Sequence, residues 1–319
     1  MASAQPSRNR APLAGPQPSG YDARMTAPAT PAAVPVLDAV REGFAFVARD
    51  WRAILPLAVI GAVGLCALQV FLDMGRARND LAVTLLLTIA AALVQAVLLA
   101  ALLRRALSQG EAPAMVALGR DEFNLMGVTL SFGFLYVIIA IFGLIVASMS
   151  LAGLLAGAGI DAAALQNLPP EEAARQFMAA LGADGTLVLL VVGAAFAALV
   201  VWIASRLLLS YPATVAEGRM YAFSTWSWTN GSGLRLAACV LLVTLGGLFL
   251  SLVALAPFGV LLDMIFGKGA QKVAGAPAHI VLSTLAAFVS VFFSLGPYAG
   301  LTAYLYRGMR ANAQPMSAS

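Results

Sequence analysis

Polar residues that could do chemistry gather in one stretch of the chain, residues 206–231, at the edge of a long apolar run. Arg206, Glu217 and Arg219 are its only charged residues, and Trp226 and Trp228 supply large amphipathic rings. Guanidinium groups bind phosphate and carboxylate strongly, and tryptophan prefers the head-group zone of a bilayer. This pattern predicts contact with an anionic lipid or a protein partner. The predicted contact residues are Arg206, Pro212, Glu217, Arg219, Trp226 and Trp228.

Common catalytic and metal-binding patterns are missing from the rest of the sequence. The single histidine, His279, has no clustered ligands around it, and Cys66 and Cys239 have no redox-motif spacing. The chain contains no G-x-x-x-x-G-K-[ST] phosphate loop and no G-x-S-x-G nucleophile elbow. We therefore expect no metal, no cofactor, no disulfide and no catalytic residue, and we predict that the protein is not an enzyme.

Composition decides the class of protein that must position these residues. Hydrophobic residues make up 61% of the chain and charged residues 11%, with a mean hydropathy of +0.88. Soluble domains have about 45–50% apolar and about 25% charged residues. A soluble fold could not bury so much apolar surface, so the composition predicts a membrane protein.

Six stretches reach the ~20 apolar residues that cross the hydrocarbon core of a bilayer. None of the six contains Asp, Glu, Lys, Arg or His, so every charged residue falls in a tail or a connection. The prediction is an all-α, polytopic membrane protein with six transmembrane helices. They are Ala53–Leu72, Leu81–Leu103, Val128–Gly157, Thr186–Ser205, Leu236–Leu262 and Ile280–Tyr306.

Basic residues predict the orientation of these spans. Five of the 19 Lys and Arg residues lie on one side of the predicted membrane, and the remaining 14 lie on the other, together with both termini. The positive-inside rule therefore places both termini in the cytoplasm. The four tryptophans agree, because they all map to that cytoplasmic interface: Trp51, Trp202, Trp226 and Trp228.

The net charge of +4 and a sequence pI near 9.3 would suggest nucleic acid as a partner of a soluble protein. Here the basic residues adjoin membrane spans, where each contributes about 1 kcal/mol of attraction to anionic lipid. We therefore expect anionic phospholipid of the cytoplasmic leaflet as a partner and no nucleic acid.

Three segments follow from the pattern along the chain. Residues 1–33, rich in Ala, Pro and Ser, are predicted to be a disordered cytoplasmic tail without a signal peptide. Residues 34–310 are predicted to form the transmembrane domain, and 311–319 a short cytoplasmic tail. The domain begins with an interfacial amphipathic helix, whose apolar face is predicted to consist of Leu37, Val40, Phe44, Val47 and Trp51.

The 206–231 stretch also resembles a known motif. Its members are Arg206, Pro212 and Glu217, followed by Thr225-Trp226-Ser227-Trp228-Thr229-Asn230-Gly231. They are similar to the R…P…E…S-W-x-L-T-x-G signature of a bacterial family of six-span membrane proteins. That family includes the membrane domain fused to some glycerophosphodiester phosphodiesterases and many stand-alone, uncharacterised members.

This resemblance extends from about Leu37 to Arg310, and includes A-Y-L-Y-R at 303–307. Thr225 stands where the family often has Ser, and Trp228 where it has Leu. The resemblance implies a six-span fold in the inner membrane of a bacterium. It implies no catalysis, because the family's activity belongs to a separate soluble barrel of roughly 250 residues.

A weak internal repeat accompanies the motif. Arg104, Arg206 and Arg307 each close an even-numbered span, at intervals of 102 and 101 residues. Aromatic residues precede each odd-numbered span. Both regularities predict three helix hairpins, each led by an interfacial segment.

Polar and helix-breaking residues inside the spans leave two interpretations open. Gln69 and Gln95 are predicted to hydrogen-bond between helices, with a substrate path as the alternative. Gly296–Pro297 predicts a kink that is structural or, alternatively, a gate. Outside the spans, Pro170 predicts a helix start and Gly182 a helix stop. Pro212 is predicted to break or redirect the helix that follows the fourth span.

Three functions are compatible with this sequence. The first is a non-catalytic scaffold, assembly or envelope-maintenance component of the inner membrane, with residues 206–231 contacting lipid or a partner. The second is a transporter or lipid translocator for a neutral or lipid substrate. The third, an enzyme acting on lipid, has only the family resemblance behind it. We expect the first.

Overall fold

Six long apolar helices run through the computed structural model, which describes residues 35–77, 80–109, 119–157, 170–267, 269 and 276–313. All six are long and apolar enough to cross a membrane, so the predicted all-α, six-span architecture is confirmed. Five of them lie in single elements, α1 (Val36–Ala77), α2 (Leu81–Leu107), α3 (Arg120–Gly157), α5 (Pro170–Leu207) and α7 (Gly233–Phe266). The sixth consists of α8 (Pro277–Ser290), the π-helical turn η3 (Val291–Leu295) and α9 (Gly296–Ala313).

Neighbouring spans pack as three hairpins, α1 with α2, α3 with α5, and α7 with α8. The predicted tail 1–33 lies outside the described residues, as do residues 314–319. In α5, Gly182 adopts φ 56° and ψ −166°, which breaks the helix at the predicted stop. A left-handed φ favours glycine because it has no Cβ.

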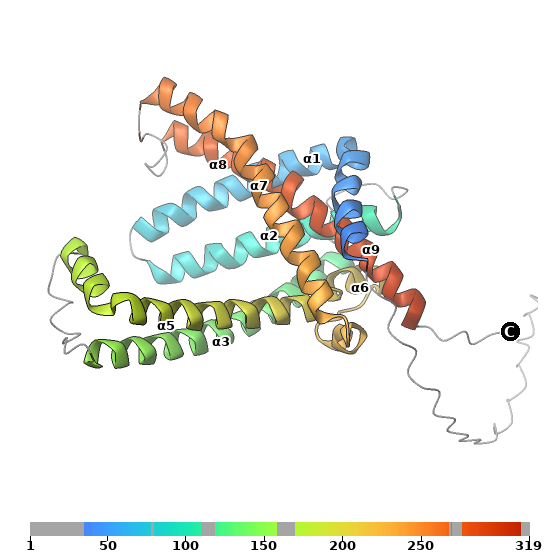
Figure 1. Cartoon of the computed structure of the whole chain (residues 1–319). Coiled ribbons are helices and arrows are strands. Elements are labelled where there is room, and N and C mark those ends of the chain that lie inside the picture. The colour runs from blue at the N-terminus through green and yellow to red at the C-terminus, as the bar shows by residue number, and fades with distance from the viewer. Residues whose placement is uncertain are drawn as a thin grey trace, which may run out of the picture. The chain divides into compact units, whose positions relative to one another are not determined.

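Helix α1 begins in the predicted lead-in segment and continues into the first span. Its first part (dark blue in Figure 1) runs at a steep angle to its later part (light blue). Pro56 lies inside this helix, and a proline there removes one hydrogen bond and bends the axis. On the predicted apolar face, Leu37 and Trp51 are exposed, Val40 and Phe44 are partly buried, and Val47 is buried. The adjoining face, which carries Ala39 and Phe46, is buried.

That second face packs against α9, at the other end of the sequence. A Cβ added to Gly43 would come within 2.7 Å of the carbonyl oxygen of Pro297, and one added to Gly300 within 2.7 Å of Phe46 Cβ. Glycine on both helices allows the two backbones to approach closely, as small residues do in membrane helix pairs. The first and last spans are therefore held together at a tight crossing.

The kink predicted at Gly296–Pro297 is present as the π-helical turn η3 just before it. Pro297 has no N–H to donate, and its ring displaces the carbonyl four residues earlier, that of Phe293. This carbonyl faces the backbone of α7 at Gly247, where any Cβ would collide with it. The turn thus lets α7 pack closely against the sixth span.

The α3–α5 hairpin packs tightly within itself but exposes most of its outer surface. A Cβ on Gly143 would overlap the ring of Phe196, so the two helices meet closely there. Among the described residues of α3, the buried ones are Glu122, Leu125, Val128, Phe132 and, near its far end, Leu155. Contact of α3 with helices outside this hairpin is therefore concentrated in its first third.

Candidate functional site

The 206–231 connection folds as two short helices between α5 and α7. Helix α5 ends at Leu207, α6 spans Ser210–Glu217, and the 3₁₀ helix η1 spans Ser224–Thr229. Pro212 is buried in the first turn of α6, where its missing N–H costs no intrahelical hydrogen bond. Its ring disfavours continuation of the preceding helix. The predicted redirection of the chain at Pro212 is therefore present.

Arg206 ties the end of α5 to η1. Its Nη1 donates to the carbonyl oxygen of Thr229 at 2.6 Å and to Oδ1 of Asn230 at 3.2 Å. The guanidinium carbon lies 5.6 Å from the ring centroid of Trp202 and 5.9 Å from that of Trp226. A planar cation suits this arrangement, because it donates at its edge and stacks with its face. Arg206 therefore holds the two ends of the connection together.

Buried hydroxyl groups also join α6 to η1 and to the residues that precede η1. Ser210 Oγ lies 2.7 Å from the carbonyl oxygen of Ala222 and 2.7 Å from Oγ1 of Thr225. Thr214 Oγ1 accepts a hydrogen bond from the backbone N–H of Tyr221 at 3.1 Å. Sequence reasoning noted Thr225 only within the motif and missed the other two. The signal available for them was the spacing of Ser210 and Thr214 by one helical turn.

Glu217 ties the end of α6 to α9. Its Oε1 accepts a hydrogen bond from the Tyr306 hydroxyl at 3.0 Å and pairs with Arg310 Nη2 at 3.0 Å. Trp228 lies beside the same tyrosine, with ring centroids 6.4 Å apart. The sequence-predicted Glu217 and Trp228 thus meet at Tyr306, which sequence reasoning did not select.

Arg219 differs from the other predicted residues of the connection. Its guanidinium lies over the ring of Tyr221, 4.7 Å from the centroid, and also donates to the Tyr221 hydroxyl. The residue is nevertheless exposed. Of the six predicted contact residues, Pro212 is buried, four are partly buried, and Arg219 is open to the surroundings.

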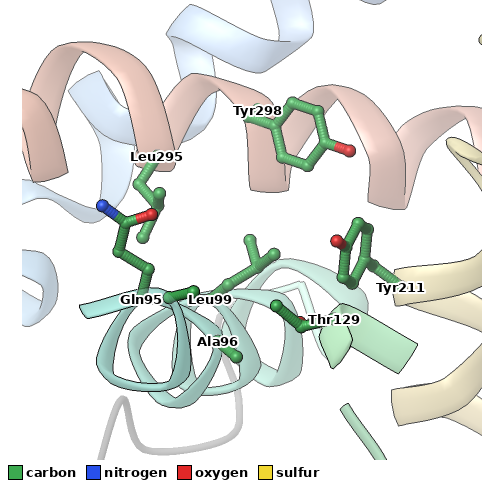
Figure 2. A pocket seen from close by; sticks show the side chains of 8 residues that line it. Gln95, Ala96, Leu99, Thr129, Tyr211, Leu295 and Tyr298 are labelled. Carbon is green, nitrogen blue, oxygen red and sulfur yellow. The ribbon is translucent and has the colours of Figure 1, made fainter. Parts of the chain in front are cut away.

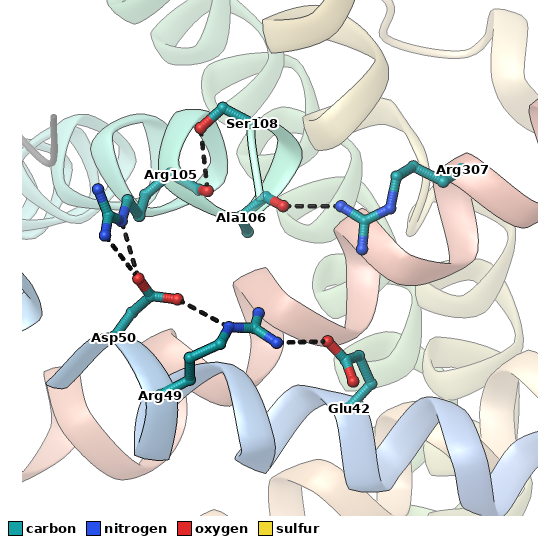
Figure 3. A network of polar contacts seen from close by, with 7 residues as sticks. All are labelled: Glu42, Arg49, Asp50, Arg105, Ala106, Ser108 and Arg307. Carbon is teal, nitrogen blue, oxygen red and sulfur yellow. Dashed lines mark hydrogen bonds and ion pairs between the residues drawn. The ribbon is translucent and has the colours of Figure 1, made fainter. Parts of the chain in front are cut away.

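A second group of charged residues joins the neighbouring helix ends, as Figure 3 shows. Arg105 of α2 donates to Oδ1 of Asp50 of α1 through Nε at 2.9 Å and Nη2 at 2.7 Å. Arg49 contacts the other oxygen of Asp50 at 3.2 Å. Arg307 of α9 donates to the carbonyl oxygen of Ala106 at 2.7 Å. These bonds hold α1, α2 and α9 together at one end of the helices.

The three arginines of the predicted repeat all bind groups on other elements. Arg104 pairs with Glu122, a buried carboxylate at the start of α3. Arg206 binds the end of η1, and Arg307 binds the end of α2. Buried acids such as Asp50 and Glu122 were not predicted from the sequence, because a carboxylate beside a span looks the same whether its partner is water or an arginine.

A cavity of about 280 Å³ is lined by residues of five elements, α2, α3, α6, η3 and α9. Gln95 of α2, Tyr211 of α6 and Tyr298 of α9 line it, and Figure 2 shows the Gln95 amide across the hollow from the two tyrosine rings. The side chain of Gln95 forms no interhelical hydrogen bond to the described residues. The remaining residues that line the cavity are Ala92, Ala96, Leu99, Thr129 and Leu295.

Gln69 and His279 both contact Asp73, near the end of α1. Gln69 donates to Asp73 of its own helix at 3.0 Å, and not to another helix as predicted. Nε2 of His279, at the start of α8, lies 3.1 Å from Oδ2 of Asp73. Cys66 and Cys239 are buried and not joined to each other. Within the described ranges no three His, Cys, Asp or Glu residues gather as metal ligands.

Comparison of the chain with protein-family models, with curated proteins and with solved structures finds no match in any of the three. The relationship to the membrane domain of glycerophosphodiester phosphodiesterases stays a prediction that rests on the motif in residues 206–231.

Proposed function

We propose that this chain is a non-catalytic protein of the bacterial inner membrane, with both termini in the cytoplasm. It acts as a scaffold or assembly component of the envelope and binds anionic phospholipid of the cytoplasmic leaflet. The six apolar spans support the membrane location. The excess of Lys and Arg on the side of the termini supports the orientation.

One observation carries the lipid proposal. At the arginine-rich ends of the helices, some arginines pair with carboxylates, and others are exposed without such a partner. The acids Asp50, Glu122 and Glu217 are engaged by Arg105, Arg104 and Arg310, respectively. Asp38 and Asp121 have no ion-pair partner among the described residues. Exposed arginines without a carboxylate partner among the described residues remain beside them. These are Arg41, Arg52, Arg120, Arg219 and Arg235.

Exposed apolar side chains accompany these arginines along the sequence. Trp51 is 47% exposed next to Arg52, Met220 is 48% exposed next to Arg219, and Leu234 is 84% exposed next to Arg235. A cation beside an apolar anchor fits the boundary between head groups and acyl chains. Each such arginine contributes about 1 kcal/mol of attraction to an anionic leaflet.

Residues 206–231 take part in two ways. Arg206, Pro212, Glu217, Trp226 and Trp228 hold the shape of the connection through the contacts described above. Arg219 and its apolar neighbours form the surface that meets the lipid. We propose the scaffold role because the connection links α5, α6, η1 and α9 into one rigid end.

Native mass spectrometry of the protein extracted with its own lipids tests this proposal. Replacing Arg52, Arg219 and Arg235 together by Gln should reduce retained phosphatidylglycerol at least threefold. Arg105→Gln is the matched control, because its guanidinium is turned inward to Asp50. This control should lower stability and leave retained lipid unchanged.

Equal phosphatidylglycerol in wild type and the triple variant would contradict lipid binding by the exposed arginines. A protein that co-purifies with wild type and is lost from the triple variant, with lipid unchanged, would assign the surface to an acidic protein partner instead. Loss of lipid from the Arg105→Gln control alone would also overturn the proposal.

A further inference from the structure

The cavity between α2, α3, α6, η3 and α9 has features of a ligand site that the arginine-rich surface lacks. We propose that it binds the uncharged, hydroxyl-bearing head group of a membrane amphiphile of the diacylglycerol type. This inference is independent of the anionic-lipid surface, since it concerns other residues at another depth.

Polar atoms around the cavity match such a head group. Gln95 offers an amide that both donates and accepts, and Thr129, Tyr211 and Tyr298 offer hydroxyl groups that can do either. The Tyr211 and Tyr298 rings form an edge-to-face pair with centroids 6.5 Å apart, which fixes where their hydroxyls lie. Ester carbonyls and a free hydroxyl of a glyceride would satisfy these groups in surroundings without bulk water.

The position of the cavity excludes a charged head group. Gln95 precedes Arg104 by nine residues, and Tyr298 precedes Arg307 by nine. At 1.5 Å rise per residue, the cavity lies about 14 Å along each helix from the arginine layer. None of its lining residues carries a charge, so a phosphate drawn to this depth would stay unpaired at a cost of several kcal/mol.

The size of the cavity suits a head group whose acyl chains stay outside it. Ligand pockets for whole drug-sized molecules range from about 300 to 1,000 Å³, and this one has about 280 Å³. Gln95 is an exposed residue, so the cavity is reachable from outside. Leu85 and Ile89 continue outward on the same helix and are 58% and 37% exposed. They provide an apolar track for acyl chains in the bilayer.

Photo-crosslinking tests this inference in the full-length protein. The protein is reconstituted in phosphatidylcholine nanodiscs with a diacylglycerol that carries a diazirine in one acyl chain. A phosphatidylglycerol with the same chain serves as the charged comparison. We expect diacylglycerol to label peptides of α2, α6 or α9 at least fivefold more than phosphatidylglycerol does. Unlabelled diacylglycerol should remove this label, whereas free glycerol should not.

Variants locate the label. Gln95→Leu combined with Tyr298→Phe should reduce labelling at least fivefold, because both changes remove hydrogen-bonding groups from the cavity wall. Gln69→Leu is the matched control, since Gln69 lies on α1 and bonds to Asp73. It should leave labelling unchanged. Should the double variant fail to elute as a folded protein, the competition in wild type alone decides the matter.

Three results would overturn the inference. Equal labelling by diacylglycerol and phosphatidylglycerol would show that the site does not select an uncharged head group. Full labelling of the folded double variant would place the site elsewhere. Displacement by glycerol would identify a soluble polyol as the ligand. None of these results bears on phosphatidylglycerol retained by the exposed arginines, so the two proposals fail separately.

Discussion

Arginine side chains at the ends of the spans fall into two kinds that look alike in the sequence. Arg104, Arg105 and Arg206 turn inward and bind carboxylates or carbonyl oxygens of other elements. Arg219 and Arg235 stay exposed. The first kind stabilises the fold through charge-assisted hydrogen bonds, and the second is the kind that we propose to bind lipid. The two kinds of arginine can be distinguished only when the position of the carboxylate or carbonyl partner in space is known.

Glycine at position 247 provides a prediction at the same scale. In Gly247→Ala the new Cβ would meet the Phe293 carbonyl, a backbone group that cannot rotate away. Overpacking of this kind costs about 1–3 kcal/mol, which exceeds the helix-propensity gain of about 1 kcal/mol. We therefore expect a lower Tm in detergent, measured by thermal unfolding.

Gly193→Ala is the control for that change, because nothing lies within 4 Å of a Cβ at that position. Its Tm should be unchanged or higher. If both variants unfolded at the same temperature, the close approach of α7 to the π-helical turn would be refuted.

At the scale of elements, short segments connect the ends of long helices. Helix α6 and η1 turn the chain back from α5 to α7, and their buried hydroxyls replace the backbone partners that a continuous helix would supply. Asp50 also joins helix ends, because its carboxylate links α1 to Arg105 of α2. Helices in lipid gain little from hydrophobic association, so hydrogen bonds and ion pairs contribute to holding them together. At these helix ends the contacts are of that polar kind.

Asp50→Asn should weaken the joint between α1 and α2. The change removes the counter-charge of Arg105, whose side chain is 21% exposed, while Asp50 is 5% exposed. Loss of a largely buried partner should destabilise the protein by about 2 kcal/mol, seen as a lower Tm. Glu42→Gln breaks an ion pair to Arg49, which is 53% exposed, and should cost less than about 1 kcal/mol. A larger effect of Glu42→Gln would contradict this ranking.

At the scale of the whole transmembrane unit, the first and last spans close the arrangement. Helix α1 packs against α9 at Gly43 and Gly300, whereas the α3–α5 hairpin has its buried contacts mainly near the start of α3. The side of α2 that leads to the cavity therefore remains in contact with the bilayer. An open flank of this kind is what a lipid-derived ligand requires.

Orientation gives a prediction for the whole molecule. In a variant with Cys66 and Cys239 changed to Ala, a single cysteine replaces either Ser227 or Leu81, both exposed residues at opposite ends of the spans. With both termini cytoplasmic, a membrane-impermeant thiol reagent should label Leu81→Cys in intact spheroplasts. It should label Ser227→Cys only after lysis. The reverse pattern would invert the topology.

The sequence by itself determined the number of spans, their approximate bounds and the break at Pro212. These follow from composition and local chemistry, because lipid requires ~20 apolar residues for each crossing and proline disfavours continuation of the helix that precedes it. The motif also singled out Arg206 and Glu217 as candidate contact residues.

Tertiary structure decided which partner each polar group has. The bonds of Arg206 to Thr229, of Glu217 to Tyr306 and of Asp50 to Arg105 join residues 23, 89 and 55 positions apart. Hydropathy and helical periodicity carry no information at such separations. The cavity depends on the same long-range packing, since Gln95, Tyr211 and Tyr298 come from three different helices and meet only when all three are in place.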